Sequence, residues 1–231
     1  MPIDLATLTT ANSGVKAAVT NYTYNVTVPA GLNRMVAVTV QCRDNDNPTN
    51  RPVTGITADG VAMVLGKARS FTDTDGDDTR AEIWLLHAPT AGVIVISVTH
   101  TGAVDHSYST AIAFCGAEQS TTPNATQEGD NQFGVDPSQI VTTTKPGCIV
   151  IDSCYHQDGA NLTAGTGQTI IAQGGTNGGG DRAISSYKIV GPAGATTMSW
   201  TNGSSADANV EVAIAIAPYF ATRPLTALGV G

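Results

Sequence analysis

Charged residues are scarce in this chain. They make up 13% of its 231 residues, against about 25% in a typical soluble protein. The 11 Lys and Arg are outnumbered by 19 Asp and Glu, which gives a net charge of -8. Binding to nucleic acid needs a basic surface that displaces counterions from the phosphates, so we expect no nucleic-acid partner. The surface must be covered largely by uncharged polar residues, which suits a protein that packs against neighbours.

Long apolar runs and helical apolar spacing are also missing. No segment approaches the roughly 20 apolar residues of a membrane-spanning helix, so we expect no membrane partner. The N-terminus, Met1-Pro2-Ile3-Asp4, lacks the basic and apolar segments of a secretion signal. The sequence therefore predicts a chain that is made and folded in a cytoplasm.

Paired cysteine motifs are absent. The chain has four cysteines, of which Cys148 and Cys154 lie on one predicted strand. An extended strand separates these two by roughly 20 Å, which is too far for a disulfide. Without a C-x-x-C pair there is no signature of a zinc site. We expect the four cysteines to be free and buried.

What the sequence does contain is a series of short β-branched runs separated by Gly, Asn, Asp and Pro. Within residues 36–42 apolar Val and Cys alternate with Ala, Thr and Gln, the period of a strand with one face on a core. Spaced strands of this kind predict a sandwich or a barrel. We predict strands at residues 22–28, 34–42, 55–58, 61–65, 80–87, 92–101, 107–116, 139–143, 148–155, 168–172, 182–190, 195–201 and 209–217.

An internal repeat organises these runs. Residues 35–41 resemble residues 148–154, Trp84 corresponds to Tyr187, and residues 111–114 correspond to 213–216. The parts occur in the same order in both halves. The repeat predicts an all-β fold: a two-sheet antiparallel jelly-roll-type sandwich built from two pseudo-repeated halves, each supplying strands to both sheets. Two independent domains are the alternative.

The predicted organisation follows from this repeat. Residues 1–20 form an N-terminal arm, and residues 21–218 form a single β-sandwich domain with repeat halves at about 22–117 and 139–218. Residues 117–136 are the crossover between the halves, and residues 219–231 are a C-terminal tail.

Several motifs together resemble a known module. They include Val53-Thr-Gly-Ile-Thr-Ala-Asp-Gly60, Ala81-Glu-Ile-Trp84, Ala88-Pro-Thr-Ala-Gly92 and Ala111-Ile-Ala-Phe114. The set is similar to the jelly-roll (lectin-like) β-sandwich module of tailed-phage virion proteins and bacterial extracellular proteins, over roughly residues 22–218. The family carries no catalytic motif to transfer to this chain.

The resemblance, with the missing leader, implies a non-enzymatic phage virion structural protein that is assembled in the host cytoplasm. We expect a head decoration, cement or minor capsid protein that forms a homo-oligomer and binds capsid or other virion proteins. The alternative is a carbohydrate-binding, lectin-like module for attachment to host or cell-surface glycans.

The acidic loop is a candidate metal site. Asp73, Asp75, Asp77 and Asp78 offer the oxygen ligands that Ca²⁺ prefers. Gly76 stands fourth in the loop, whereas an EF-hand needs its Gly at the sixth position. The other interpretation is a solvated hairpin tip, and no other cofactor is expected.

Candidate catalytic residues are few. Glu82 and Glu211 lie within apolar strands, and glycosidases use such carboxylate pairs. An outward-facing position on each strand explains them equally well. The four histidines are scattered, and there is no H-E-x-x-H or G-x-S-x-G motif.

Candidate binding residues are aromatic or lie near the C-terminus. Trp84, Tyr187, Trp200 and Tyr219 could stack on a sugar, although equivalent positions of a repeat favour a core role. The C-terminal segment has little charge, and we expect it to dock onto a neighbouring subunit, or else to remain a mobile tail. Its candidate partner-binding residues are Phe220, Leu225, Leu228 and Val230.

Overall fold

The computed structural model describes residues 2–44, 52–72, 78–131, 136–157, 161–176, 181–201 and 209–220, and within them it contains strands and turns but no helix. All strand pairs in this part of the chain are antiparallel. The expectation of an all-β, sandwich-like protein with antiparallel sheets is therefore confirmed. The described residues include no helix of the length and hydropathy needed to cross a bilayer.

The first half is organised around one long strand, β8 (Gly92–Cys115). The start of β8 pairs with β2 and β4, and its end pairs with β3 and β1. The strand thereby joins an outer layer, β2-β8-β4-β5, to an inner layer, β1-β8-β3-β7-β6. The other strands are β1 (Asp4–Asn12), β2 (Lys16–Val28), β3 (Met35–Asp44), β4 (Val53–Ala58), β5 (Val61–Ala62), β6 (Val64–Thr72) and β7 (Asp78–His87).

The second half has two separate sheets. The inner sheet has the order β13-β14-β11-β16-β9, and the outer sheet has the order β10-β15-β12. Its strands are β9 (Ala125–Asn131), β10 (Ser138–Thr143), β11 (Ile149–His156), β12 (Thr163–Ala164), β13 (Thr169–Thr176), β14 (Asp181–Ile189), β15 (Gly194–Thr201) and β16 (Asn209–Ile216).

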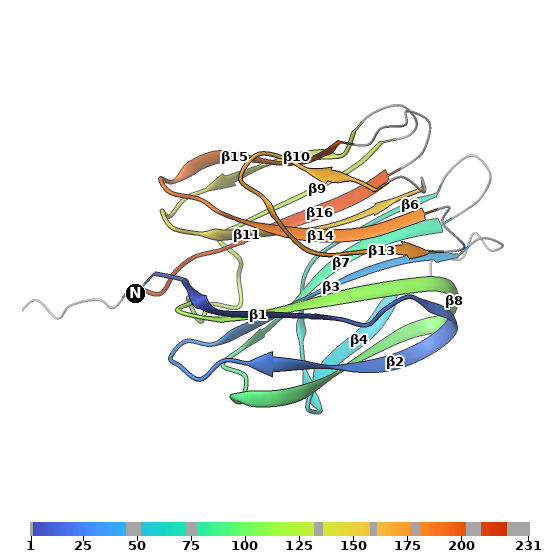
Figure 1. Cartoon of the computed structure of the whole chain (residues 1–231), viewed down its shortest axis with the longest axis horizontal. Helices are drawn as coiled ribbons and strands as arrows, with labels where there is room; N and C mark the ends of the chain where they lie inside the picture. Colours follow the sequence, from blue (N-terminus) through green and yellow to red (C-terminus); the bar gives the residue numbers. More distant parts are fainter. Residues whose placement is uncertain are drawn as a thin grey trace, which may run out of the picture.

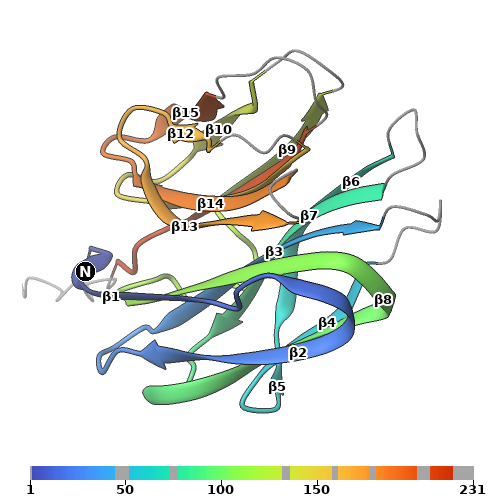
Figure 2. The same ribbon diagram turned by 45° about the vertical axis from the view of Figure 1, so that its right-hand side comes forward.

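The halves stack with their inner sheets face to face, as Figures 1 and 2 show. Met35, Ile83 and Phe114 of the first half share one buried cluster with Ile151 and Val212 of the second. Each half also buries apolar side chains between its own inner and outer layers. Burial of this apolar area is the main stabilising term, and the shared cluster makes the two halves one packed body.

The arrangement differs from the predicted sandwich of two shared sheets. No described strand of the first half pairs with a strand of the second. Outside the named strands, backbone pairing joins the halves at an isolated β-bridge between Ala117 and Pro218. In the first half, β8 bends and forms hydrogen bonds in both layers, so this half builds its two layers from its own strands.

Two segments that were expected to lack strands contain them. Residues 1–20, expected as an arm, include β1 and the start of β2. The predicted crossover, residues 117–136, includes β9. Both β1 and β9 pair with a single neighbour and form sheet edges. The sandwich therefore begins earlier in the sequence than predicted, and so does the second half.

The register of the predicted repeat also needs a correction. Met35 lies in the cluster between the halves, whereas Cys148 lies in the outer core of the second half. Trp84 faces the outer core of its half, whereas Tyr187 packs against the cluster between the halves. Neighbouring residues of a strand point to opposite faces, and the two members of each of these predicted pairs face different cores.

Candidate partner-binding surface

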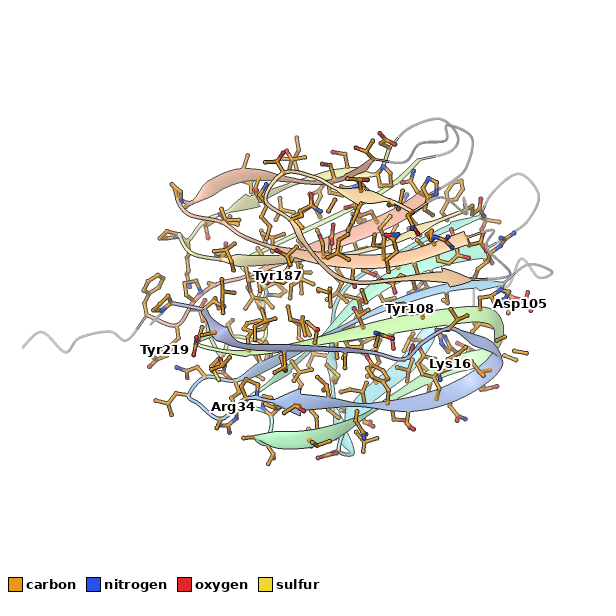
Figure 3. All side chains as sticks on the ribbon, in the orientation of Figure 1. Lys16, Arg34, Asp105, Tyr108, Tyr187 and Tyr219 are labelled. Atoms are coloured by element: carbon orange, nitrogen blue, oxygen red, sulfur yellow. The ribbon has the colours of Figure 1, made fainter. Side chains whose placement is uncertain are left out.

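Both ends of the described chain meet at one end of the molecule. Glu118 N donates to Ala217 O at 2.8 Å, and Tyr219 N donates to Gly116 O at 2.7 Å. These hydrogen bonds hold the segment after β16 against the segment after β8. Figure 3 places Tyr219 at the end where Figure 1 marks the N-terminus.

Gly116 permits a close approach of the N-terminal segment. It has a φ of +81°, and a Cβ there would lie 2.2 Å from Pro2 O. That distance is too short for any side chain, and the positive φ favours glycine. The N-terminal and C-terminal segments therefore both pack on the Gly116 turn.

Two surface hollows open beside these segments, and both include Phe220. One has a volume of about 290 Å³ and is lined almost wholly by apolar residues, namely Pro2, Pro146, Gly147, Pro218 and Phe220. The other, of about 530 Å³, has a polar wall and is lined by Glu118, Gln119, Ser120, Lys145, Tyr219 and Phe220. We call this combined area the terminal surface.

The terminal surface presents an aromatic pair beside an ion pair. Phe220 is 54% exposed and Tyr219 is 39% exposed. Lys145 Nζ donates to both carboxylate oxygens of Glu118 at 2.6 Å. An exposed aromatic beside a polar rim is the pattern of a protein interface.

Of the predicted partner-binding residues, the structure places Phe220 on this surface. Leu225, Leu228 and Val230 lie outside the described residues. Sequence reasoning did not find Pro2, Pro146 or Lys145, because they come from segments that are far apart along the chain.

The candidate calcium loop lies mostly outside the described residues, since Asp73, Asp75 and Asp77 fall between 72 and 78. Asp78 is buried at the start of β7, and its Oδ1 accepts a hydrogen bond from Thr72 Oγ1. In the described part of the chain, no three His, Cys, Asp or Glu side chains cluster in a way that could hold a metal ion.

The two candidate catalytic glutamates lie in different halves. Glu82 is buried in the first half, where Trp84 Nε1 donates to its Oε2 at 2.6 Å and Val53 N donates to its Oε1 at 3.2 Å. Glu211 is fully buried in the second half. They point into separate cores, so the hypothesis of a Glu82–Glu211 glycosidase pair was wrong.

The second half contains another buried carboxyl group, Asp152. Its Oδ1 accepts Ser186 N and Ser186 Oγ, both at 2.7 Å, and its Oδ2 accepts Trp200 Nε1 at 3.0 Å. Burial raises the pKa of Asp152 to about 6 and that of Glu211 well above its usual value. Sequence reasoning missed Asp152, which follows three apolar residues of β11.

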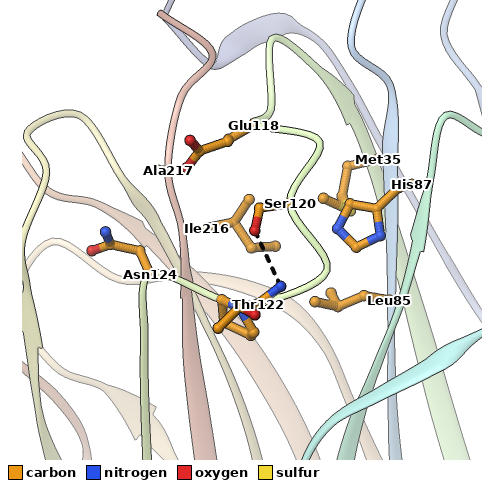
Figure 4. A pocket seen from close by; sticks show the side chains of 10 residues that line it. Met35, Leu85, His87, Glu118, Ser120, Thr122, Asn124, Ile216 and Ala217 are labelled. Carbon is orange, nitrogen blue, oxygen red and sulfur yellow. Dashed lines mark hydrogen bonds between the residues drawn. The ribbon is translucent and has the colours of Figure 1, made fainter.

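A small cavity lies between the halves near the terminal surface (Figure 4). It has a volume of about 10 Å³, and its wall includes Met35, Leu85, His87 and Ile216. Burial lowers the pKa of His87. A space of this size holds at most one water molecule, so the cavity is no ligand site.

The aromatic residues divide into core and surface groups. Trp200 is fully buried, Trp84 is 8% exposed, and Tyr187 is partly buried against the cluster between the halves. Within the described ranges, Tyr219 and Phe220 are the exposed aromatics. A sugar could therefore stack on the terminal surface but not on the tryptophans.

Comparison of the chain with protein-family models, with curated proteins and with solved structures gave no match.

Proposed function

We propose that this protein is a non-enzymatic structural protein that binds neighbouring subunits of an assembly through the terminal surface. The observation that carries the proposal is the exposure of Phe220 and Tyr219 where both ends of the described part of the chain are anchored. The apolar hollow around Phe220 supports it, because burying an aromatic side chain is a major source of interface energy.

The assembly that we propose is a tailed-phage virion, with this chain as a head decoration, cement or minor capsid protein. The motifs that resemble the virion jelly-roll module support this role. The low charge supports it too, since only 13% of residues are charged and interface cores are depleted in charge.

Each half of the chain, in this proposal, is one copy of the same jelly-roll-type module. The strand orders support it: β6-β7-β3-β8-β1 in one inner layer matches β13-β14-β11-β16-β9 in the other. The outer layers match in the same way, as β2-β8-β4 and β10-β15-β12.

The test is incorporation of the chain into particles produced from the genome that encodes it. We expect mass spectrometry to find the wild-type chain in purified particles. F220S should reduce its copy number at least tenfold, and deletion of residues 222–231 should reduce it further. The matched control is I170S, because Ile170 is 43% exposed on β13 and lines neither hollow of the terminal surface.

Two results would overturn the proposal. Absence of the wild-type chain from the particles would exclude the virion role, and binding to a glycan array would then favour the lectin alternative. Normal incorporation of F220S would exclude the terminal surface as the binding site.

A further inference from the structure

The first half buries the carboxylate of Glu82 between its inner and outer layers with a cation beside it. Trp84 Nε1 donates to Glu82 Oε2 at 2.6 Å, and Val53 N of the outer layer donates to Oε1 at 3.2 Å. Arg80 Nε also donates to Oε1. A carboxylate with a cation and further donors is compensated in its charged form.

The second half buries the carboxyl group of Asp152 between its own two sheets, again beside a tryptophan. Trp200 Nε1 of the outer sheet donates to Asp152 Oδ2 at 3.0 Å, and Ser186 N donates to Oδ1 at 2.7 Å. Gln168 links the same group to the outer sheet, because its Nε2 donates to Ser186 Oγ at 2.9 Å and its Oε1 accepts Ser199 N at 2.7 Å. Asp152 is therefore the centre of the polar contacts between the two sheets.

At this second site an acid takes the place of the cation. Glu211 lies on β16, next to β11, and its side chain enters the same core as Asp152. It is fully buried, and its two carboxyl oxygens meet no hydrogen-bond donor in the described part of the chain. Two buried carboxylates repel each other, so a proton held on one of them stabilises the closed pair.

The other titratable or charged side chains described on the packed faces are Cys154 and His156 of β11 and Arg182 and Lys188 of β14. Burial raises the pKa of the Cys154 thiol well above its ordinary value, and His156 is fully buried at the end of β11. Arg182 and Lys188 donate to oxygens of Asn161 and Thr197 at 3.2 and 3.3 Å. The described residues that face the pair from β9, β10, β12, β13 and β15 are uncharged.

The outer layers of the two halves are attached in different ways. In the first half, β8 continues from the outer layer into the inner layer, so a backbone ladder joins them. In the second half, β10-β15-β12 and β13-β14-β11-β16-β9 are separate sheets. Side chains hold these two sheets together, through apolar clusters and through the contacts of Asp152. The outer sheet of the second half can therefore open without breaking a ladder between the sheets.

We propose that the outer sheet of the second half is a pH-operated lid, which opens when the Asp152–Glu211 pair loses its last proton. Opening moves Trp200 away from Asp152 and lets water reach both carboxylates. The closed lid holds a proton that the open lid releases, so proton loss favours opening. The outer layer of the first half stays closed, because Arg80 compensates Glu82 and β8 ties the layers together.

The direction of the pH dependence follows from the two carboxyl groups. Burial raises the pKa of Asp152 to about 6 and that of Glu211 well above its ordinary value. Between these two values the closed pair binds one proton. The open pair binds none, since carboxyl groups in water have pKa values of about 4. The opening equilibrium should therefore increase about tenfold for each pH unit above about 6.

Hydrogen–deuterium exchange of the purified wild-type chain, followed by mass spectrometry from pH 6 to pH 8, tests the proposal. Each rate is divided by the intrinsic exchange rate at that pH. We expect the corrected exchange of β10 and β15 to rise about tenfold per pH unit. The corrected exchange of β2 and β4, which form the outer layer of the first half, should stay constant and is the internal control.

Two variants test the origin of the effect. E211Q has no proton to lose at this position, so the corrected exchange of β15 should become independent of pH. E128Q is the matched control, since it removes a partly exposed carboxyl group from the same half, and it should keep the wild-type slope. Circular dichroism and the melting temperature establish that each variant is folded, and the comparison of the two halves in the wild type needs no variant.

Three results would overturn the inference: equal pH slopes for β15 and for β2 in the wild type, loss of protection in all strands together, or a wild-type slope in folded E211Q. The inference does not depend on the terminal surface or on a virion. F220S should show the same exchange pattern as the wild type, so the lid and the proposed function fail separately.

Discussion

Asp152 and Glu211 form a pair of carboxyl groups inside the second half. They lie on neighbouring strands, where Asp152 is opposite Ala213 and Glu211 is opposite Cys154, so both point into the same core. Both side chains are fully buried. Among the described residues, no donor reaches either carboxyl oxygen of Glu211. Two carboxylates cannot donate to each other, so a hydrogen bond between these groups requires a proton on one of them.

This pair predicts a stability that falls as the pH rises. Burial raises the pKa of Asp152 from 3.8 to about 6 and raises that of Glu211 further above its ordinary value. Between these ordinary and raised pKa values the folded protein binds more protons than the unfolded chain. The stabilisation is therefore complete below about pH 4 and is lost as the pH rises through 6 and above. From the Asp152 shift alone we expect the unfolding free energy from urea titrations to drop by about 2–3 kcal/mol from pH 4 to pH 7, and the Glu211 shift acts in the same direction.

Removing one carboxyl group of this pair should make the unfolding free energy depend less on pH. E211Q keeps the shape of the side chain and supplies an amide donor for Asp152, so its stability should change less between pH 4 and pH 8. E128Q is the control, because Glu128 is partly exposed and pairs with Lys67 at 3.1 Å. Equal pH slopes for E211Q and the wild type would contradict the coupling of Asp152 and Glu211.

An ion pair across the halves should contribute strongly to stability. Arg43 Nη1 donates to both carboxylate oxygens of Asp181 at 2.7 Å, and Tyr155 OH donates to Asp181 Oδ2 at 2.9 Å. The Asp181 side chain is 1% exposed. We expect D181N to reduce the unfolding free energy by about 3 kcal/mol, because it removes the buried negative charge that Arg43 Nη1 contacts.

The comparison for D181N is E118Q, which breaks the exposed Lys145–Glu118 pair. That change should cost at most about 1 kcal/mol. Y155F should cost about 1 kcal/mol, and a double-mutant cycle with D181N should show coupling. Additive effects of Y155F and D181N would contradict a shared network.

The buried thiols should be unreactive in the folded protein. Cys42, Cys115, Cys148 and Cys154 are free and buried, as the sequence predicted. Burial raises the pKa of the Cys42 and Cys154 thiols, which removes the thiolate that reacts with disulfide reagents. Titration with such a reagent at pH 8 should detect these two thiols only after denaturant is added, and rapid labelling of Cys42 or Cys154 in the native protein would contradict their burial.

The sequence predicted strands where residue types alternate with a period of two. Residues 36–42 alternate, and β3 indeed sends Val36 and Val38 into one core and Met35 and Ala37 into another. Both faces of β3 are buried, however, because the inner sheets lie between two cores. Alternation of Val with Ala and Thr therefore predicted a strand but not a central position for it.

The missed elements have physical reasons. The strand β9 is polar and lies at a sheet edge, so it lacks an apolar alternation to detect. β8 was predicted as two strands because Gly102 to His106 resembles a loop, whereas the structure has one continuous strand through this segment. For the terminal surface, the sequence predicted Phe220 from the low charge of its segment. The neighbours of Phe220 depend on tertiary contacts that no local pattern encodes.

A close approach between the halves predicts that one glycine is irreplaceable. At Gly174 on β13, a Cβ would lie 2.4 Å from the ring of Tyr108, which belongs to β8 of the other half. Tyr108 is buried in the cluster between the halves and has little room to move. G174A should therefore reduce the unfolding free energy by about 1–3 kcal/mol through overpacking.

The control is G191A, since a Cβ at Gly191 meets no atom within 4 Å. Alanine at this position should be neutral or stabilising by up to about 1 kcal/mol. Equal melting temperatures of G174A and G191A would show that the two halves do not approach each other as closely as the structure places them.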